Sequence, residues 1–217
     1  ILMEKDINQG IIKKSIVEFP GESISSVFKK TIETLENTIG VFYIYNKSKK
    51  LIYVDYSKDI KNKVIKLFTS KKFIPKYVQN NFKSIKVHKT GNIEIAILKA
   101  IQEIKSLRPK INNNIDPRLF YKIDIPQIII DKKNFIITFS GKKDDEKGFI
   151  LFKNKKVLGY GYFDLFNNIN TEKKLNSRVV KVNECKKVKN FVYGLISENR
   201  YKKLLTLNEI YKFSGIE

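Results

Sequence analysis

The chain has 217 residues, of which 42% are hydrophobic, so it can bury a core and is not expected to be disordered. Its 43 Lys and Arg residues outnumber 22 Asp and Glu residues, which gives a formal net charge of +21. A field of that sign favours polyanions such as DNA, RNA or anionic lipid over acidic protein partners. Lysine, a solvated point charge, supplies almost all of the positive charge, which favours contact with a phosphate backbone over sequence-specific reading of bases.

Cysteine content and hydrophobic runs indicate the compartment. Cys185 is the single cysteine, which excludes an internal disulfide and a multi-cysteine zinc site and predicts a reducing, cytoplasmic location. No apolar run approaches the roughly 20 residues that span a bilayer, so neither a transmembrane segment nor a membrane partner is expected. The chain starts at Ile1 without a stretch of signal-peptide type, as a piece of a longer protein would.

The first part of the chain combines a helical start with strand-like runs. Residues 1–36 predict a helical connector, with its clearest helix at 27–35. Two runs rich in aromatic and β-branched residues follow, at 40–46 and 50–56. The short polar break between them predicts a β-hairpin.

Helical and strand patterns then alternate. A helix is expected at 58–68 with Ser57 as its N-cap, followed by a lysine-rich loop around Pro75. The run 84–90 alternates like a third strand, and a helix is expected at 93–107. This region, residues 37–112, is expected to form one domain.

A second α+β unit is expected after a linker. Residues 113–126 have lost periodicity and contain two prolines, so they predict the linker, and 127–217 predict a small antiparallel domain. Strands are expected at residues 127–131, 134–140, 148–153, 157–163, 178–182 and 203–207, with a helix at 186–197.

The first unit carries a recognisable motif series. Gly40-Val41-Phe42, then Tyr53-Val54-Asp55, then a basic helix and the run TGNIEIAILKAIQEIKSLRPKIN resemble a GIY-YIG nuclease domain over residues 37–112. The resemblance implies an α+β fold with a three-stranded antiparallel sheet flanked by helices. It also implies DNA cleavage with one divalent metal, a tyrosine, a helix arginine and a helix glutamate.

Some of the family's catalytic positions are kept. Tyr53 stands where the second motif tyrosine belongs, and Asn112 stands at the terminal asparagine. Lys63 takes the place of the arginine, but it lacks the planar fork that arginine presents to a phosphate. The resemblance therefore assigns Tyr53, Lys63 and Asn112 to the former catalytic cleft, which is expected to be inactive.

Other positions depart from the family's pattern. Phe42 lacks the hydroxyl of the first motif tyrosine, Asp55 replaces the motif glycine, and Leu67 stands at a histidine or tyrosine position. Ala100 stands where the family has its metal-binding glutamate, and alanine offers no oxygen to a hard cation. No metal or other cofactor is therefore expected; Glu103, one helical turn further, and Asp55 are the candidate substitute ligands.

The second unit has a resemblance of its own. The runs IIIDKKNFIITFSGKKDDEKGFILFKNKKVLGYGYFDL and KVKNFVYGLISENRYKKLLTL are similar to the C-terminal module of bacterial proteins that fuse a DNA polymerase III epsilon-type exonuclease to a GIY-YIG domain, related to the GIY-YIG component of bacterial excinuclease. The opening residues resemble the junction after that exonuclease. The resemblance then implies that the exonuclease and the family's cysteine-containing region are absent from this chain.

Positive charge is concentrated between residues 61 and 93, where no acidic residue occurs. This segregation of charge predicts a surface that binds the phosphate backbone of a nucleic acid. The alternative is a lysine-rich surface that is solvated and binds no nucleic acid. The predicted nucleic-acid-binding residues are Lys61, Lys63, Lys66, Lys71, Lys72, Lys76, Lys83, Lys86 and Lys89. The single histidine, His88, is expected to be a surface residue of the third strand.

The favoured hypothesis is a nucleic-acid-binding module that derives from a GIY-YIG nuclease and has lost catalysis. It is expected to act in DNA replication or repair, with replication or repair proteins as partners. Two alternatives remain open. One is an active DNA nuclease that uses Tyr53 and Glu103 with Mg or Mn. The other is an RNA- or ribosome-associated structural protein, because lysine-rich surfaces do not distinguish RNA from DNA.

Overall fold

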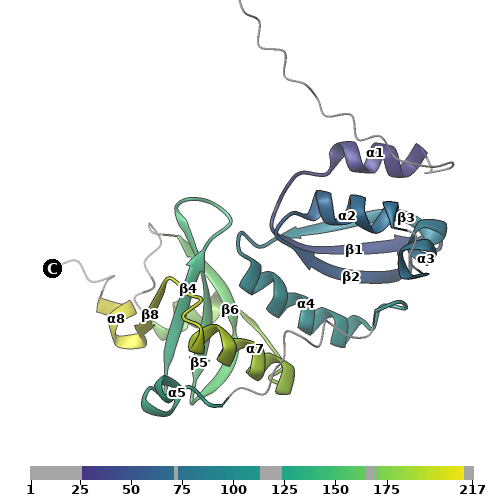
Figure 1. Cartoon of the computed structure of the whole chain (residues 1–217). Helices are drawn as coiled ribbons and strands as arrows, with labels where there is room; N and C mark the ends of the chain where they lie inside the picture. Colours follow the sequence, from purple (N-terminus) through teal and green to yellow (C-terminus); the bar gives the residue numbers. More distant parts are fainter. Residues whose placement is uncertain (1–25, 71–72, 113–123, 165–168, 170, 213–217) are drawn as a thin grey trace, which may run out of the picture.

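The computed structural model describes residues 26–70, 73–112, 124–164, 169 and 171–212 (Figure 1). Most of the expected connector and linker, together with Lys71 and Lys72, lies outside these residues. Within them, no helix is long and apolar enough to cross a membrane. The fold is α+β, with two antiparallel sheets formed by successive parts of the chain.

The first sheet has three antiparallel strands. Its central strand β1 (Gly40–Asn46) pairs with β2 (Leu51–Ser57) on one side and with β3 (Phe82–Lys89) on the other. The hairpin and the third strand predicted from the sequence are therefore confirmed. Helices α1 (Ser26–Thr34) and α2 (Ile60–Thr69) share an apolar cluster with one face of this sheet, whereas α4 (Ile93–Leu107) packs on the other.

Two sequence predictions in this part were wrong in detail. The N-cap of α2 is Asp59, whose carboxylate accepts the Asn62 N–H at 3.0 Å, while Ser57 instead bonds the Asp59 backbone. The expected loop around Pro75 contains the helix α3 (Phe73–Asn81). Proline is tolerated there because the first turn of a helix does not use its N–H groups within the helix.

The second sheet has the strand order β7-β6-β5-β4-β8, and every pairing is antiparallel. Its strands are β4 (Phe135–Ser140), β5 (Glu146–Lys153), β6 (Lys156–Asp164), β7 (Val179–Lys181) and β8 (Lys203–Thr206). Its helices are α5 (Gln127–Asp131), α6 (Glu172–Ser177), α7 (Lys186–Ser197) and α8 (Leu207–Lys212).

The strand predicted at 127–131 is the helix α5, because periodicity does not distinguish so short an apolar run from a helical turn. Gly159 and Gly161 lie inside β6, not in a phosphate-binding loop. A Cβ on Gly161 would lie 2.3 Å from the Arg178 carbonyl oxygen, so close contact with the chain at β7 requires glycine there.

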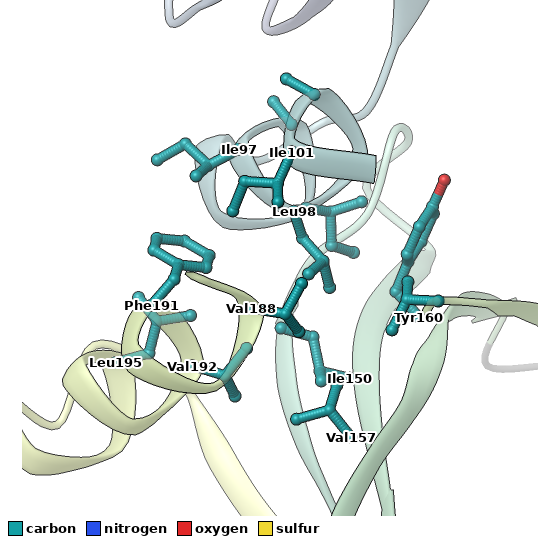
Figure 2. Packing of buried hydrophobic residues seen from close by; sticks show 14 of the residues in the cluster. Ile97, Leu98, Ile101, Ile150, Val157, Tyr160, Val188, Phe191, Val192 and Leu195 are labelled. Carbon is teal, nitrogen blue, oxygen red and sulfur yellow. The ribbon is translucent and has the colours of Figure 1, made fainter. Parts of the chain in front are cut away.

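Helix α4 contributes to a core that reaches both sheets (Figure 2). Its Leu98 is fully buried together with Val188 of α7 and Ile150 of β5, and Phe191 packs from α7 in the same cluster. On the other side of α4, the same cluster includes Val41 of β1. The two sheets are thus joined through one helix, and the division at 113–126 stays a prediction about sequence units.

Candidate functional site

A pocket of about 580 Å³ lies between β2 and α2, on the face of the first sheet opposite α4. The strands contribute an aromatic and acidic wall, and α2 contributes positions spaced three and four residues apart, which share one helix face. The lining residues are Phe42, Tyr53, Asp55, Ser57, Lys58, Asp59, Asn62, Lys63, Lys66, Leu67 and Ser70.

Strand register explains why Tyr53 and Asp55 point into this pocket. Phe42 faces Asp55 across the β1–β2 ladder, and Ile44 faces Tyr53. Directly opposed residues project from the same side of a sheet, and both Phe42 and Ile44 belong to the apolar cluster of α1 and α2. The register therefore brings a tyrosine and a carboxylate together on the α2 side.

Asp55 is the centre of a hydrogen-bonded group in the pocket. Its Oδ2 accepts a hydrogen bond from the Tyr53 hydroxyl at 2.9 Å and lies 2.8 Å from Lys63 Nζ. Its Oδ1 accepts the Tyr56 backbone N–H at 2.8 Å, and Lys63 Nζ also donates to the Tyr56 carbonyl oxygen at 3.0 Å. Both carboxylate oxygens of Asp55 are thus occupied by donors of the protein itself.

The tyrosine of this group remains a neutral phenol. Burial raises the pKa of Tyr53 far above its ordinary value, and the adjacent Asp55 charge and hydrogen bond raise it further. The ionised form of a tyrosine is disfavoured by a nearby carboxylate. Tyr53 therefore acts here as a hydrogen-bond donor, and the site offers no phenolate at neutral pH.

The pocket does not fit the divalent metal that the family resemblance implies. The ammonium of Lys63 stands 2.8 Å from the Asp55 carboxylate that a cation would need, and Ala100 is fully buried in the apolar cluster of α4. Among the described residues, no group of three or more His, Cys, Asp or Glu side chains is placed to hold a metal. A hard cation needs several oxygen ligands, and the second pocket carboxylate, Asp59, is engaged as the N-cap of α2.

Glu103 does not join Tyr53. Its carboxylate accepts a hydrogen bond from the Tyr43 hydroxyl and pairs with Lys99 one helical turn away. Tyr43 faces Val54 in the ladder and packs with α4, so Glu103 lies on the face of the sheet opposite the pocket. The structure thus places Tyr53 and Glu103 on opposite faces of the sheet, which does not favour the alternative of a nuclease that uses both residues.

Asn112 holds the chain against the edge strand β2 of the same sheet. Its side-chain amide makes two hydrogen bonds with the Val54 backbone, one of them from Val54 N–H to Oδ1 at 3.1 Å. The Ile111 N–H donates to the Ile52 carbonyl oxygen at 2.9 Å. The two residues close the free edge of β2, and Asn112 does not line the pocket, although sequence reasoning assigned it to the cleft.

The predicted lysines do not form one surface. Lys63 and Lys66 line the pocket, whereas Lys86 faces Tyr43 and so projects from the opposite side of the sheet. Lys89 pairs with Glu36. Lys61 is partly exposed on α2, and Lys76 and Lys83 are exposed.

Sequence reasoning missed one lysine of the pocket, Lys58. It lies within the helix expected at 58–68, but Asp59 separates it from the run without acidic residues, from which the nucleic-acid-binding lysines were predicted. Its place directly after β2, the strand that carries Tyr53 and Asp55, was the available signal.

Comparison with curated proteins identifies relatives named UvrABC system protein C. The chain is 27% identical to the UvrABC system protein C of Borreliella burgdorferi strain ZS7 over 178 residues, covering 78% of this chain and 26% of that protein. The protein of the same name from Borrelia garinii subsp. bavariensis is also 27% identical with the same coverage. The chain thus spans about a quarter of the length of these relatives, and no family model matches it.

Comparison with solved structures finds the GIY-YIG N-terminal endonuclease domain of UvrC from Thermotoga maritima. The magnesium-bound form is 20% identical, with a TM-score of 0.38, and the match covers 41% of this chain and 99% of that one. A point mutant of the same domain, bound to its catalytic divalent cation, gives the same TM-score at 98% coverage.

The comparison with curated proteins supports a relationship to UvrC, whereas the resemblance to polymerase III epsilon-type proteins stays a prediction. An alignment covering 78% of the chain necessarily includes parts of both sheets. The sequence of this chain is thus similar to UvrC over parts of both sheets.

Proposed function

We propose that this chain is a DNA-binding module of a repair system, derived from a UvrC-like nuclease domain and without metal-dependent cleavage. The observation that carries the proposal is the Tyr53–Asp55–Lys63 group, in which a lysine ammonium occupies the neighbourhood of the one pocket carboxylate near the tyrosine. Similarity to UvrC supplies the connection to DNA.

The charge around the pocket supports binding of phosphates. Lys58, Lys63 and Lys66 line the pocket, and Lys61 lies on the same helix α2. The whole chain adds a net charge of +21. Contacts of lysines with phosphates release counterions from the nucleic acid, so binding of this kind weakens steeply as salt is added.

Charge reversal on α2 tests the binding. The triple variant Lys58→Glu, Lys61→Glu, Lys66→Glu is expected to bind duplex DNA about 100-fold more weakly near 0.1 M salt, with a salt slope lower by about 2 to 3. Fluorescence anisotropy over a salt series measures both quantities. The same titration with RNA of equal length separates DNA binding from the RNA-associated alternative.

The matched control reverses the charge of three exposed lysines elsewhere in the chain. Two of them, Lys155 and Lys156, lie at the β5–β6 turn, and the third, Lys173, lies on α6. This control changes the net charge by the same amount, so affinity loss in both variants would mean that only the overall charge matters. An unaltered salt slope in the α2 variant would remove the pocket from the binding surface.

Absence of cleavage is the second expected result. Labelled DNA incubated with the protein and Mg²⁺ or Mn²⁺ should remain intact at high protein concentration, because the pocket lacks the ligands that would hold the metal. Gel electrophoresis of the products measures this. Metal-dependent cleavage that disappears in Tyr53→Phe would instead establish the nuclease alternative.

A further inference from the structure

A second positively charged surface lies where the two sheets meet, away from the pocket. We define this junction face by four residues, Lys86 and His88 of β3, Lys142 of the β4–β5 turn and Tyr162 of β6; Lys99 of α4 is adjacent, but its side chain is 13% exposed and paired with Glu103. Neither the pocket nor the residues that we assign to DNA binding on α2 reach this face.

Strand register places the β3 side chains on the α4 side of the first sheet. Lys86 faces Tyr43 and His88 faces Val41 across the β1–β3 ladder, and both partners pack against α4. Helix α4 itself packs on β2 and β1. The β3 end of this face is therefore left to solvent, and Lys86 and His88 are both exposed.

The second sheet brings further charge to the same place. The Tyr162 hydroxyl donates to the Thr90 carbonyl oxygen at 2.9 Å, directly after β3, and Lys142 Nζ lies 3.9 Å from the centre of the Tyr162 ring. The turn that carries Lys142 touches the chain at Gly91, where a Cβ would lie 2.0 Å from the Gly141 carbonyl oxygen. Figure 1 shows this turn beside the start of α4.

The pKa of His88 is influenced by the charged residues around it. Burial lowers the pKa of the His88 imidazole, the Lys99 and Lys142 charges lower it further, and Glu103 opposes them. Glu103 pairs with Lys99, and the Glu146 carboxylate accepts the Lys142 backbone N–H at 2.7 Å. Lys142 keeps its ammonium free of both carboxylates and lies against the Tyr162 ring, so it is the lysine of the second sheet that adds positive charge beside His88.

We propose that the junction face is a second contact for the phosphodiester backbone of a nucleic acid strand, built jointly by the two sheets. This inference rests on the proposed DNA-binding function. Charge complementarity identifies the occupant: separated lysines beside a neutral histidine suit a chain of phosphates spaced along a strand. Tyr162 is held by its hydrogen bond to Thr90, so the position of Lys142 relative to β3 is fixed before a strand binds.

The single histidine makes the test direct. His88 gives the only imidazole resonances of the full chain, so NMR follows its pKa with and without a thymidine DNA strand of about 12 nucleotides. Phosphates near the ring stabilise the imidazolium, so its pKa is expected to rise by about 0.5 to 1 unit when DNA binds. A uridine RNA strand of equal length is the parallel arm, which separates the two sources of phosphodiester.

Two variants locate the effect. The double variant Lys86→Glu, Lys142→Glu should lose the DNA-induced rise at His88 and bind the strand about 10-fold more weakly. The double variant Lys58→Glu, Lys66→Glu on the pocket side should weaken total binding but keep the rise at His88, because those lysines lie on the other face of the sheet.

The outcomes separate this inference from the proposed function. If the native chain binds DNA while the pKa of His88 and the affinity of the Lys86/Lys142 variant stay unchanged, the junction face is not a contact and the inference is overturned. If no DNA or RNA binds, the proposed function itself fails. A rise at His88 with anionic phospholipid vesicles but not with either strand would assign the face to lipid and overturn the inference as well.

Discussion

Replacing Ala100 with glutamate should destabilise the protein by about 3–5 kcal/mol and should not create a metal site. Ala100 is 0% accessible to solvent and lies in the apolar cluster of α4 with Val41 and Val54, away from the pocket. A carboxylate there has no partner and must either remain ionised in an apolar core or take up a proton. Urea unfolding followed by circular dichroism measures the loss.

Ser106→Glu is the matched control, because it adds the same charge to an exposed position of the same helix. It is expected to cost less than about 0.5 kcal/mol, as exposed substitutions usually do. A rise in the melting temperature of the Ala100→Glu variant with added Mg²⁺, absent in the control, would show that the position still reaches a metal site and would contradict the geometry described above.

The elements that sequence reasoning predicted well are those with strong local signals. The β1–β2 hairpin follows from two aromatic and β-branched runs around a polar break. The long helix α4 follows from its apolar periodicity, and Asn92 caps it by accepting the Ile95 N–H at 2.8 Å. Where local signals were weak, as in the short run that forms α5, the type of element could not be decided from the sequence alone.

The site was harder to predict because it depends on which side of the sheet each residue occupies. Motif spacing grouped Tyr53 with Lys63, which line the same pocket, but it gave no information that Glu103 would lie on the other face of the sheet. In the ladder, Tyr53 and Asp55 face Ile44 and Phe42, whereas Val54 between them faces Tyr43, so neighbouring residues of one motif project from opposite faces. The register is set only when two strands pair, so the spacing of motifs along the sequence does not reveal which face each side chain occupies.

The lysine cluster shows the same limit. Nine lysines without an intervening acidic residue look like one surface in the sequence, yet Lys63 of α2 and Lys86 of β3 lie on different sides of the first sheet. Lys142, in turn, lies about fifty residues beyond β3 in the chain and reaches His88 only through contact between the sheets. Charge density along a sequence therefore predicts the attraction to polyanions but not the number of surfaces.

Asp55→Asn should strengthen DNA binding by about fivefold or more, in contrast to most substitutions in a binding pocket. Asp55 holds Lys63 at 2.8 Å and thereby neutralises one of the pocket lysines. Asparagine keeps an oxygen acceptor for Tyr53 or the Tyr56 N–H but releases the ammonium toward a phosphate. The salt slope of binding should increase by about 1, and anisotropy titrations measure both changes.

The accompanying loss of stability should be small. Lys63 is 41% exposed, and an ion pair with an exposed partner contributes less than about 1 kcal/mol. Asp131→Asn is the matched control, since it removes one negative charge from an exposed position of α5 that belongs to neither the pocket nor the junction face. Equal gains in both variants would reduce the effect to net charge alone.

A double variant decides whether Lys63 is the group that Asp55 restrains. If it is, the gain from Asp55→Asn should vanish in a Lys63→Gln background, so the two substitutions will be non-additive by the full amount of the gain. Persistence of the gain without Lys63 would mean that Asp55 repels phosphates directly. In the first case, Asp55 neutralises the Lys63 ammonium in the pocket, and the gain in affinity measures the release of that charge toward a phosphate.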